Sequence, residues 1–391
     1  MFENLVDRRN TSSAKWDETI MNVGIEDVVP LTVADMDFKA SPEIVSSMVE
    51  AANHGIYGYT IVDESYIDSI LHWVRNNHNW YPEKDWYVYC PRIIQAIAMI
   101  IQNFSEENDK IMIQTPLYDP IQESIGINGR KLISSDLILK DEHYEIDFID
   151  FESKLKDGVK VFICVSPHNP TGRVWKKWEL EKIVNLCKKY GVLIISDEVH
   201  ADFIWKGSFV SFGEFLDTYD RIVICNSPSK TFNIPGLEAS SIFIKNKDIR
   251  ERFEEIINKT GIHNPNYFSV FAVKAAYNDS YEWYRLLKET IKNNISYVKD
   301  FFDSLDGFEV TKSEGTFLLW IDYRKSGLSE DDMEEIFKKS KVLFSLGSGY
   351  GDTGRGFIRI NVASPRTLLE EALESFKEQV LLEGFYAKEE S

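Results

Sequence analysis

Residues 221–236 read RIVICNSPSKTFNIPG, and they place Lys230 just beyond a strand-like run. The apolar residues of that run are continuous rather than alternating, as in strands that are covered on both faces. Lys230 is flanked by small hydroxyl residues and lies in no charge run or amphipathic helix face. A single lysine is most often a surface residue, so its role depends on which other residues the fold brings to it.

Five further short runs rich in β-branched residues precede this one, at residues 86–89, 110–114, 131–135, 160–166 and 192–196. Helical patterns separate them. Residues 176–191, for example, are apolar at helical spacing and end at Gly191, which is typical of an amphipathic crossover helix with a glycine stop. Strands that alternate with helices predict an α/β fold with a mainly parallel sheet.

The pattern changes after about residue 285. A long helix is expected over residues 286–305, followed by strand-like segments and a terminal amphipathic helix. We therefore predict a large domain over residues 41–285, beginning with a helix capped by Ser41, and a smaller α+β domain over residues 286–391. Residues 1–40 are too few to form a core and are expected to pack on the domains.

Composition restricts the partners of this chain. With 391 residues and a net charge of −19, it is not expected to bind nucleic acid or an anionic membrane. The four cysteines are scattered and suggest buried free thiols rather than a metal or redox site. No apolar run is long enough to span a membrane, and the first residues do not resemble a signal peptide, so we expect a cytoplasmic protein.

Three polar residues follow neighbouring predicted strands. Asn169 comes after residues 160–166, Asp197 after residues 192–196, and Lys230 after residues 221–226. In an open parallel sheet, ligands bind beyond the carboxyl ends of the strands. A desolvated lysine forms a Schiff base with an aldehyde, and a carboxylate beside a pyridine nitrogen keeps that ring protonated. These groups together favour pyridoxal 5′-phosphate (PLP) chemistry.

The remaining cofactor contacts follow from the same reasoning. Asn169 would hydrogen-bond the 3′ oxygen of the ring, and Tyr118 can lie flat on the pyridine. The phosphate would rest on backbone N–H groups near Arg92 and Ile93, where a helix begins, with the Ser227 hydroxyl opposite.

Motifs from nearly the whole chain resemble one family. In order, they are TSSAKWD (11–17), VADMDF (33–38), YGYT (57–60), PHNPTGRVW (167–175), SDEVHADF (196–203), SPSKTFNIPGL (227–237) and GFIRINVASPR (356–366). The chain resembles the fold-type I PLP-dependent enzymes of aminotransferase class I/II. Within them it is most similar to the MalY/PatB-type cystathionine β-lyase (C–S lyase) branch.

The resemblance implies roles for matching positions. Lys230 would form the Schiff base and act as base at the substrate Cα, Asp197 would pair with the pyridine nitrogen, and Asn169 with the 3′ oxygen. Arg359 would bind the substrate carboxylate, a bidentate task that suits arginine. Tyr59 would reach the phosphate bound by a neighbouring subunit, so the resemblance implies a homodimer with shared active sites.

Two positions depart from the wider family, and one stretch imitates another kind of site. Arg92 stands where family members usually have a small residue, and His200 stands where classical aminotransferases have a tyrosine. His200 can be either an ordinary hydrogen-bonded histidine or a contact of the cofactor.

Residues 346–354, LGSGYGDTG, look like a phosphate loop. They lie too late in the chain for a dinucleotide fingerprint, and we interpret them as a flexible loop near the substrate.

The function implied by these observations is β-elimination from L-cystathionine or a related S-substituted cysteine, which yields pyruvate, ammonia and a thiol. The alternative is a class I/II aminotransferase that uses the same residues. No position stands out as a second arginine for a side-chain carboxylate, which disfavours transamination of aspartate. A regulatory protein partner is a further possibility that the sequence leaves open.

Overall fold

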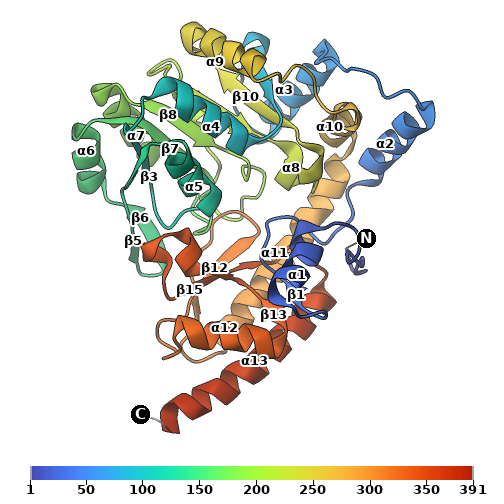
Figure 1. Ribbon diagram of the computed structural model, residues 1–391, viewed down its shortest axis with the longest axis vertical. Helices are drawn as coiled ribbons and strands as arrows, with labels where there is room; N and C mark the ends of the chain where they lie inside the picture. Colours follow the sequence, from blue (N-terminus) through green and yellow to red (C-terminus); the bar gives the residue numbers. More distant parts are fainter. Residues whose placement is uncertain (1, 390–391) are drawn as a thin grey trace.

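The two largest β-sheets, of seven and four strands, lie one above the other along the long axis of the computed structural model, which describes residues 2–389 (Figure 1). The larger sheet has the order β2-β10-β9-β8-β7-β3-β4. Only β10 runs antiparallel to its neighbours. The strands are β2 (Tyr87–Cys90), β3 (Lys110–Ile113), β4 (Lys131–Ser134), β7 (Val159–Val165), β8 (Leu193–Asp197), β9 (Ile222–Asn226) and β10 (Ser240–Ile244).

The predicted parallel sheet is therefore confirmed. All six strands expected from the sequence are present, with ends that differ by one or two residues. The seventh, β10, was not predicted. The central strands β7, β8 and β9 are buried at nearly every residue, because apolar clusters cover both faces of the sheet. This double coverage is the reason that their hydrophobicity is continuous.

Helices pack around the larger sheet (Figure 1). The predicted crossover helix is α7, which ends at Gly191 in the left-handed conformation (φ 71°). Ser41 caps α2, as expected, by accepting a hydrogen bond from the Ile44 N–H. The helices of this part are α2 (Pro42–His54), α3 (Glu64–His78), α4 (Ile93–Phe104), α5 (Asp119–Ile127), α6 (Phe148–Lys156), α7 (Lys177–Tyr190), α8 (Pro228–Thr231), α9 (Lys247–Lys259) and α10 (Tyr267–Asp279).

The smaller sheet is antiparallel and comes from the C-terminal part of the chain. Its order is β11-β12-β15-β14, from Glu309–Val310, Leu318–Asp322, Phe357–Asn361 and Ser345–Leu346. Three helices accompany it, α11 (Tyr281–Asp303), α12 (Glu330–Ser340) and α13 (Arg366–Glu389). The α+β character of this part is as predicted. The domain limits 41–285 and 286–391 stay predictions, and α11 runs continuously across the boundary between them.

The N-terminal segment is joined to the C-terminal part. After α1 (Thr19–Val23), strand β1 (Val29–Pro30) pairs in parallel with β13 (Val342–Leu343). A hairpin of β5 (Leu137–Lys140) and β6 (His143–Ile146) completes the strands. All four cysteines are buried and free, as predicted. Among residues 2–389, no helix has the length and apolar character needed to cross a membrane.

A buried ionic cluster holds the N-terminal segment in place. The carboxylate of Asp37, which has no exposed side-chain surface, accepts hydrogen bonds from Lys15 Nζ at 2.7 Å, Arg8 Nη1 at 2.9 Å and Trp16 Nε1 at 2.9 Å. Ser364, beyond β15, donates to the same carboxylate at 2.6 Å. Lys15 is itself fully buried, so neither charge of the Lys15–Asp37 pair has access to water.

The substitution Asp37→Asn is expected to destabilise the fold strongly, because it removes the nearest counter-ion of the buried Lys15 ammonium and leaves only Asp35, at 3.9 Å. Breaking a buried pair from one side costs about 3–5 kcal/mol. Asp7→Asn is the matched control, since Asp7 forms an exposed pair with Arg9, and exposed pairs contribute little to stability. Urea denaturation of both variants measures the difference. Equal midpoints for the two variants would contradict the role of the cluster.

Candidate active site

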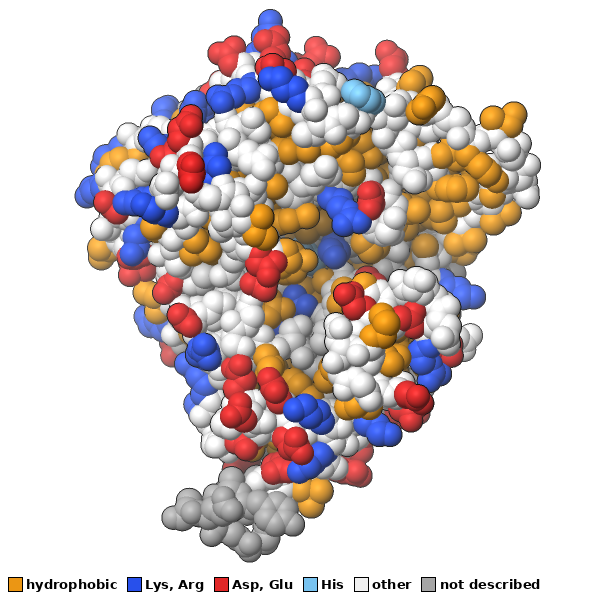
Figure 2. Space-filling view, in the orientation of Figure 1, with side chains coloured by type: hydrophobic (Ala, Val, Ile, Leu, Met, Phe, Trp, Pro, Cys, Tyr) orange, Lys and Arg blue, Asp and Glu red, His pale blue; other side chains and the backbone are white. Residues whose placement is uncertain are grey.

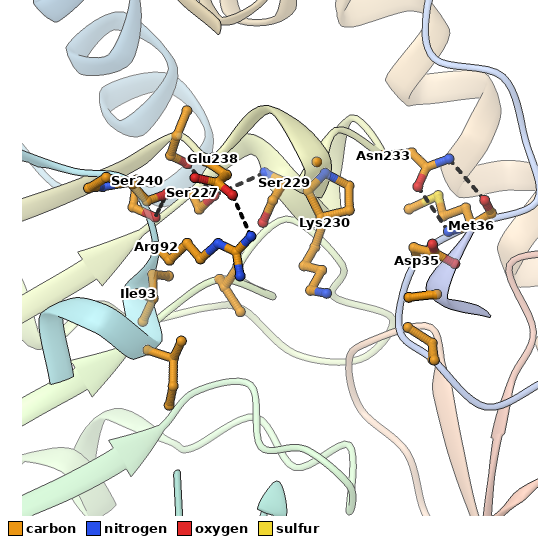
Figure 3. A pocket seen from close by; sticks show the side chains of 18 of the residues that line it. Asp35, Met36, Arg92, Ile93, Ser227, Ser229, Lys230, Asn233, Glu238 and Ser240 are labelled. Carbon is orange, nitrogen blue, oxygen red and sulfur yellow. Dashed lines mark hydrogen bonds and ion pairs between the residues drawn. The ribbon is translucent and has the colours of Figure 1, made fainter. Parts of the chain in front are cut away.

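A cavity of about 720 Å³ lies between the part built on the larger sheet and the N-terminal segment (Figures 2 and 3). Its walls come from the N-terminal segment, the start of α4, the end of β8 and the region around α8. Six of the residues singled out from the sequence line it: Arg92, Ile93, Tyr118, Asp197, Ser227 and Lys230. The carboxyl ends of the parallel strands therefore meet at one cavity, as expected.

Lys230 extends into this cavity from α8 (Figure 3). Its Nζ donates a hydrogen bond to the backbone oxygen of Ala34, 2.8 Å away in the N-terminal segment. Burial lowers the pKa of Lys230 to about 8, against the opposing effect of the nearby Asp35 carboxylate. A larger share of this amine is therefore neutral near pH 7 than for an ordinary lysine, and only the neutral amine is nucleophilic.

Asp197 ends strand β8 and is almost fully buried. Burial raises the pKa of its carboxyl group to about 6, although the Val199 N–H donates to it at 3.1 Å. Burial thus lowers the pKa of Lys230 and raises the pKa of Asp197, because it disfavours the charged form of each group. A cationic ring nitrogen beside Asp197 would restore the charged carboxylate.

The start of α4 offers backbone donors to an anion. The side chain of its N-cap residue, Arg92, accepts no hydrogen bond from the helix, so the first backbone N–H groups of α4 are left without a side-chain acceptor at the cavity. Arg92 has φ −135° and ψ 141°, ordinary extended values that need no glycine. Its guanidinium lies in the cavity, where it forms an ion pair with Glu238, another lining residue (Figure 3). The departure from a small residue therefore leaves the backbone donors intact.

Ser227 and Ser229 lie on the opposite side of these donors (Figure 3). The Ser227 hydroxyl donates to the Ala239 carbonyl at 2.6 Å and accepts from the Ser229 N–H at 3.1 Å. It is thus occupied with capping α8. The Ser229 hydroxyl also lines the cavity and has no hydrogen-bond partner within residues 2–389, so it is the better placed donor. Sequence reasoning missed it, although it adjoins Lys230.

Arg359 and Asn169 meet beside the cavity. Arg359 projects from β15, and its Nη1 donates to Asn169 Oδ1 at 3.2 Å. Its Nη2 donates to the Thr32 carbonyl at 2.5 Å, whereas its Nε is buried without a partner in the described part of the chain. The contact with Arg359 orients the Asn169 amide so that its Nδ2 is the end left to donate.

The other predicted residues have different positions. Tyr118 is the N-cap of α5 and lines the cavity. His200 is buried against the Phe317 ring, with centroids 5.7 Å apart, and its Nδ1 has no partner among the described residues. Burial lowers the pKa of His200 to about 3, so its ring is neutral. Tyr59 is fully exposed on the loop between α2 and α3 and does not line the cavity of its own chain.

Asp35 is a cavity residue to which the sequence assigned no role. Arg8 Nη2 donates to Asp35 Oδ2 at 2.7 Å, and the same guanidinium reaches Asp37. Asn233, three residues after Lys230, holds the adjacent Met36 by donating to its carbonyl at 3.0 Å and accepting from its N–H at 2.9 Å (Figure 3). The only sequence signal was the alternation of acids in VADMDF.

The glycine-rich stretch 346–354 forms two short turns rather than a flexible loop. A Cβ on Gly347 would lie 1.9 Å from the Gly354 oxygen, and one on Gly354 would lie 2.1 Å from the Gly347 oxygen. The glycines therefore allow the two turns to pack on each other. Tyr350, between them, lies under the Arg359 guanidinium at 5.2 Å. The loop that we expected is thus a pair of packed turns, and its position near the substrate stays a prediction.

Comparison with known proteins agrees with this geometry. The family model described as aminotransferase class I and II matches residues 26–376. The chain belongs to this family. Cystathionine β-lyase PatB of Bacillus subtilis (strain 168) is 36% identical over 381 residues, which cover 96% of this chain and 98% of PatB. This places the chain in the PatB/MalY-type branch that its motifs resemble.

Two solved structures are similar over almost the whole chain. Cystalysin from Treponema denticola, whose structure contains a PLP cofactor, has a TM-score of 0.93 and 34% identity, with 97% of this chain and 98% of cystalysin covered. A PLP-bound putative aminotransferase from Clostridium difficile 630 has a TM-score of 0.93 and 39% identity, with 97% and 99% covered. The fold is thus that of fold-type I PLP enzymes, as predicted.

The reactivity of Lys230 in the cofactor-free protein should follow its lowered pKa. Acetylation of Lys230 is expected to rise with pH with a midpoint of about 8, whereas a lysine in a model peptide has a midpoint of ~10.4. Asp35→Asn should move the midpoint lower still, because the Asp35 carboxylate stabilises the ammonium. Mass spectrometry of the Lys230 peptide measures both profiles. A midpoint above 10 in the unsubstituted protein would contradict the burial of this amine.

Proposed function

We propose that this protein is a PLP-dependent C–S β-lyase that cleaves L-cystathionine or a related S-substituted cysteine to pyruvate, ammonia and a thiol. The observation that carries the proposal is that Lys230 and Asp197 line the same cavity, with their pKa values shifted to about 8 and about 6. The names of the relatives support the same class, since PatB is a cystathionine β-lyase and cystalysin contains PLP.

The residues present fit the cofactor. An aldehyde needs a desolvated amine, which Lys230 supplies, and a pyridinium needs a buried carboxylate, which Asp197 supplies. A phosphate needs free N–H groups and hydroxyls, which the α4 start, near Ile93, and Ser229 supply. When bound, PLP supplies an aldehyde carbon and a ring that accepts electrons from the substrate Cα.

In this proposal Arg359 orients the substrate, and Lys230 acts as the base. Arg359 binds the α-carboxylate with its planar guanidinium, which the Asn169 and Thr32 contacts hold in place. Lys230 Nζ would remove the proton from Cα, and a thiolate would leave from Cβ. Asp197 would hold the pyridine nitrogen of PLP, Asn169 Nδ2 would donate to its 3′ oxygen, and Tyr118 would pack against its ring.

Transamination is the second candidate. It would use the same residues but return the proton to the cofactor rather than expel a leaving group, and the similarity to a protein described as a putative aminotransferase favours it. The comparison with PatB at 36% identity favours elimination.

The chain's four buried free cysteines fit a reducing compartment, and we therefore propose a cytoplasmic location.

We further propose that the enzyme works as a homodimer with shared sites. Tyr59 is fully exposed, and its hydroxyl makes no hydrogen bond with the residues that the structure describes. It belongs to an apolar patch, visible in orange at the upper right of Figure 2, on α2, the following loop and α10. Its exposed residues are Val45, Val49, Ile56, Tyr57, Tyr59, Ile61 and Phe271. Contiguous apolar surface of this kind is typical of a subunit interface.

The reaction itself separates the two functions. L-Cystathionine should yield pyruvate, ammonia and thiol in equal amounts at a steady rate without any 2-oxo acid, because elimination regenerates the aldehyde form of the cofactor each turn. A coupled lactate dehydrogenase assay measures the pyruvate. If product stops at about one equivalent per site and resumes when a 2-oxo acid is added, the protein is an aminotransferase.

Arg359→Lys should impair substrate use far more than cofactor binding. Losing a bidentate charged pair costs ~1.5–3 kcal/mol, which corresponds to a roughly 10–150-fold lower kcat/KM. Steady-state kinetics with an S-substituted cysteine and the visible absorbance of the cofactor measure the two effects separately. Unchanged kinetics would remove Arg359 from the substrate site.

Mixed dimers test the shared site. Lys230→Ala and Tyr59→Ala proteins should each have little activity, and a mixture refolded together should recover about a quarter of normal activity, since half of the dimers are mixed and each has one intact site. If Tyr59 acted within its own chain, no mixed dimer would contain an intact site. Absence of recovery, with mixed dimers shown by affinity tags, would therefore contradict the proposal.

A further inference from the structure

A second cavity, of about 770 Å³, shares no lining residue with the cavity of Lys230. It is bounded on one side by residues that follow strands β7 and β8, and on the other by α11, β11 and β12. Its size is within the range of ~300–1,000 Å³ that is typical of small-molecule sites. None of the roles proposed above uses it.

The charged residues of this cavity are predominantly basic. Five lysines line it, Lys176, Lys177, Lys206, Lys299 and Lys312, with one carboxylate, Glu314. The charge of Glu314 is already compensated, because Arg173 Nη1 lies 2.6 Å from it and the His143 ring lies 3.3 Å away. A cluster of lysines is notable in a chain with a net charge of −19, since most of the surface repels anions.

Two of these lysines lack counter-ions. Lys177 pairs with Glu214 at 2.7 Å, and Lys299 pairs with Asp303. Lys312 Nζ lies 3.8 Å from the Glu142 carboxylate and donates to the Asp141 carbonyl at 2.6 Å. For Lys176 and Lys206, no carboxylate of the described residues lies within 4.0 Å. Both side chains are exposed at the cavity and free to turn toward a ligand.

An apolar floor distinguishes this cavity from an ordinary solvated lysine surface. It consists of Val174, Val210, Ile295, Val310 and Leu319. All but Ile295 are at most 9% exposed. Lysine stems can lie along such a surface while their ammonium groups stay at its edge. A ligand that matches both features has an apolar body and anionic groups at its rim.

We propose that this cavity binds a small organic anion with an apolar body and at least two negative charges. Lys176 and Lys206 contribute from the side of the larger sheet, and Lys299 and Lys312 from the side of the smaller sheet and α11. The ligand therefore joins the two parts of the molecule and favours the arrangement in which their lysines face the same space.

The wall of this cavity also leads toward Asn169. The N–H groups of Glu314 and Gly315 both donate to the Gly172 carbonyl at 2.8 Å, and Arg173 forms its ion pair with Glu314. Gly172 and Arg173 end the turn that begins at Asn169. A bound anion at the neighbouring Lys312 thus acts on the segment that positions this turn.

Calorimetric titration of the PLP-loaded protein with naphthalene-1,5-disulfonate tests the proposal, since this probe has an apolar body and two charges. One saturable site per chain is expected. The double substitution Lys176→Ala/Lys206→Ala should weaken binding about tenfold, as removal of two exposed charge contacts predicts. The control Lys131→Ala/Lys188→Ala removes two exposed lysines elsewhere and should leave the affinity within about twofold.

A third variant fills the cavity without removing a lysine, and so tests whether the ligand binds inside the cavity. Ser208 is exposed at the cavity, so Ser208→Trp fills the cavity without disturbing the core and should abolish the heat of binding. Inorganic sulfate, which lacks an apolar body, should bind at least about tenfold more weakly than the disulfonate. Absence of saturable binding, equal affinity in all variants, or equal affinity for sulfate would overturn the proposal.

Discussion

The N-terminal segment between residues 31 and 38 is held by hydrogen bonds from both sides, and the site depends on this arrangement. From the smaller sheet, Arg359 donates to the Thr32 carbonyl, and Asn361 donates to the carbonyls of Val33 and Asp35. From the larger sheet's side, Lys230 donates to Ala34. This one segment thus fixes the distance between the amine that reacts and the guanidinium that binds the substrate, because Lys230 donates to the Ala34 carbonyl and Arg359 to the nearby Thr32 carbonyl.

Local burial and local donors allow this acidic chain to bind an anionic ligand, although its net negative charge repels anions. The acidic chain repels anions at long range, yet the cavity collects N–H groups and hydroxyls at short range, with the Arg359 guanidinium beside it. Desolvation moves Lys230 toward its neutral form and Asp197 toward its protonated form. Each group is therefore poised for a partner that is absent from the polypeptide: an aldehyde for the amine and a cationic nitrogen for the carboxylate.

The fold could be predicted to the extent that it depends on local patterns. Continuous apolar runs located β7, β8 and β9, and glycine and serine signals located the ends of α7 and α2. The positions of Lys230 and Asp197 followed from strand ends alone. The orientation of Asn169 by Arg359 could not be foreseen, because it joins residues 190 positions apart. The hydrogen bond from the Ser227 hydroxyl to the Ala239 carbonyl, which leaves Ser229 as the free hydroxyl, could not be foreseen either.

The anchoring of residues 31–38 also has a consequence for synthesis on the ribosome. The contact between Thr32 and Arg359 spans 327 positions, and that between Asp37 and Ser364 also spans 327. At ~5–20 residues per second, the donors emerge on the order of 16–65 s after their acceptors. The larger sheet can form in that interval, but the N-terminal wall of its cavity is not anchored until β15 is complete. Co-translational capture of the cofactor is therefore postponed until nearly the whole chain has left the exit tunnel.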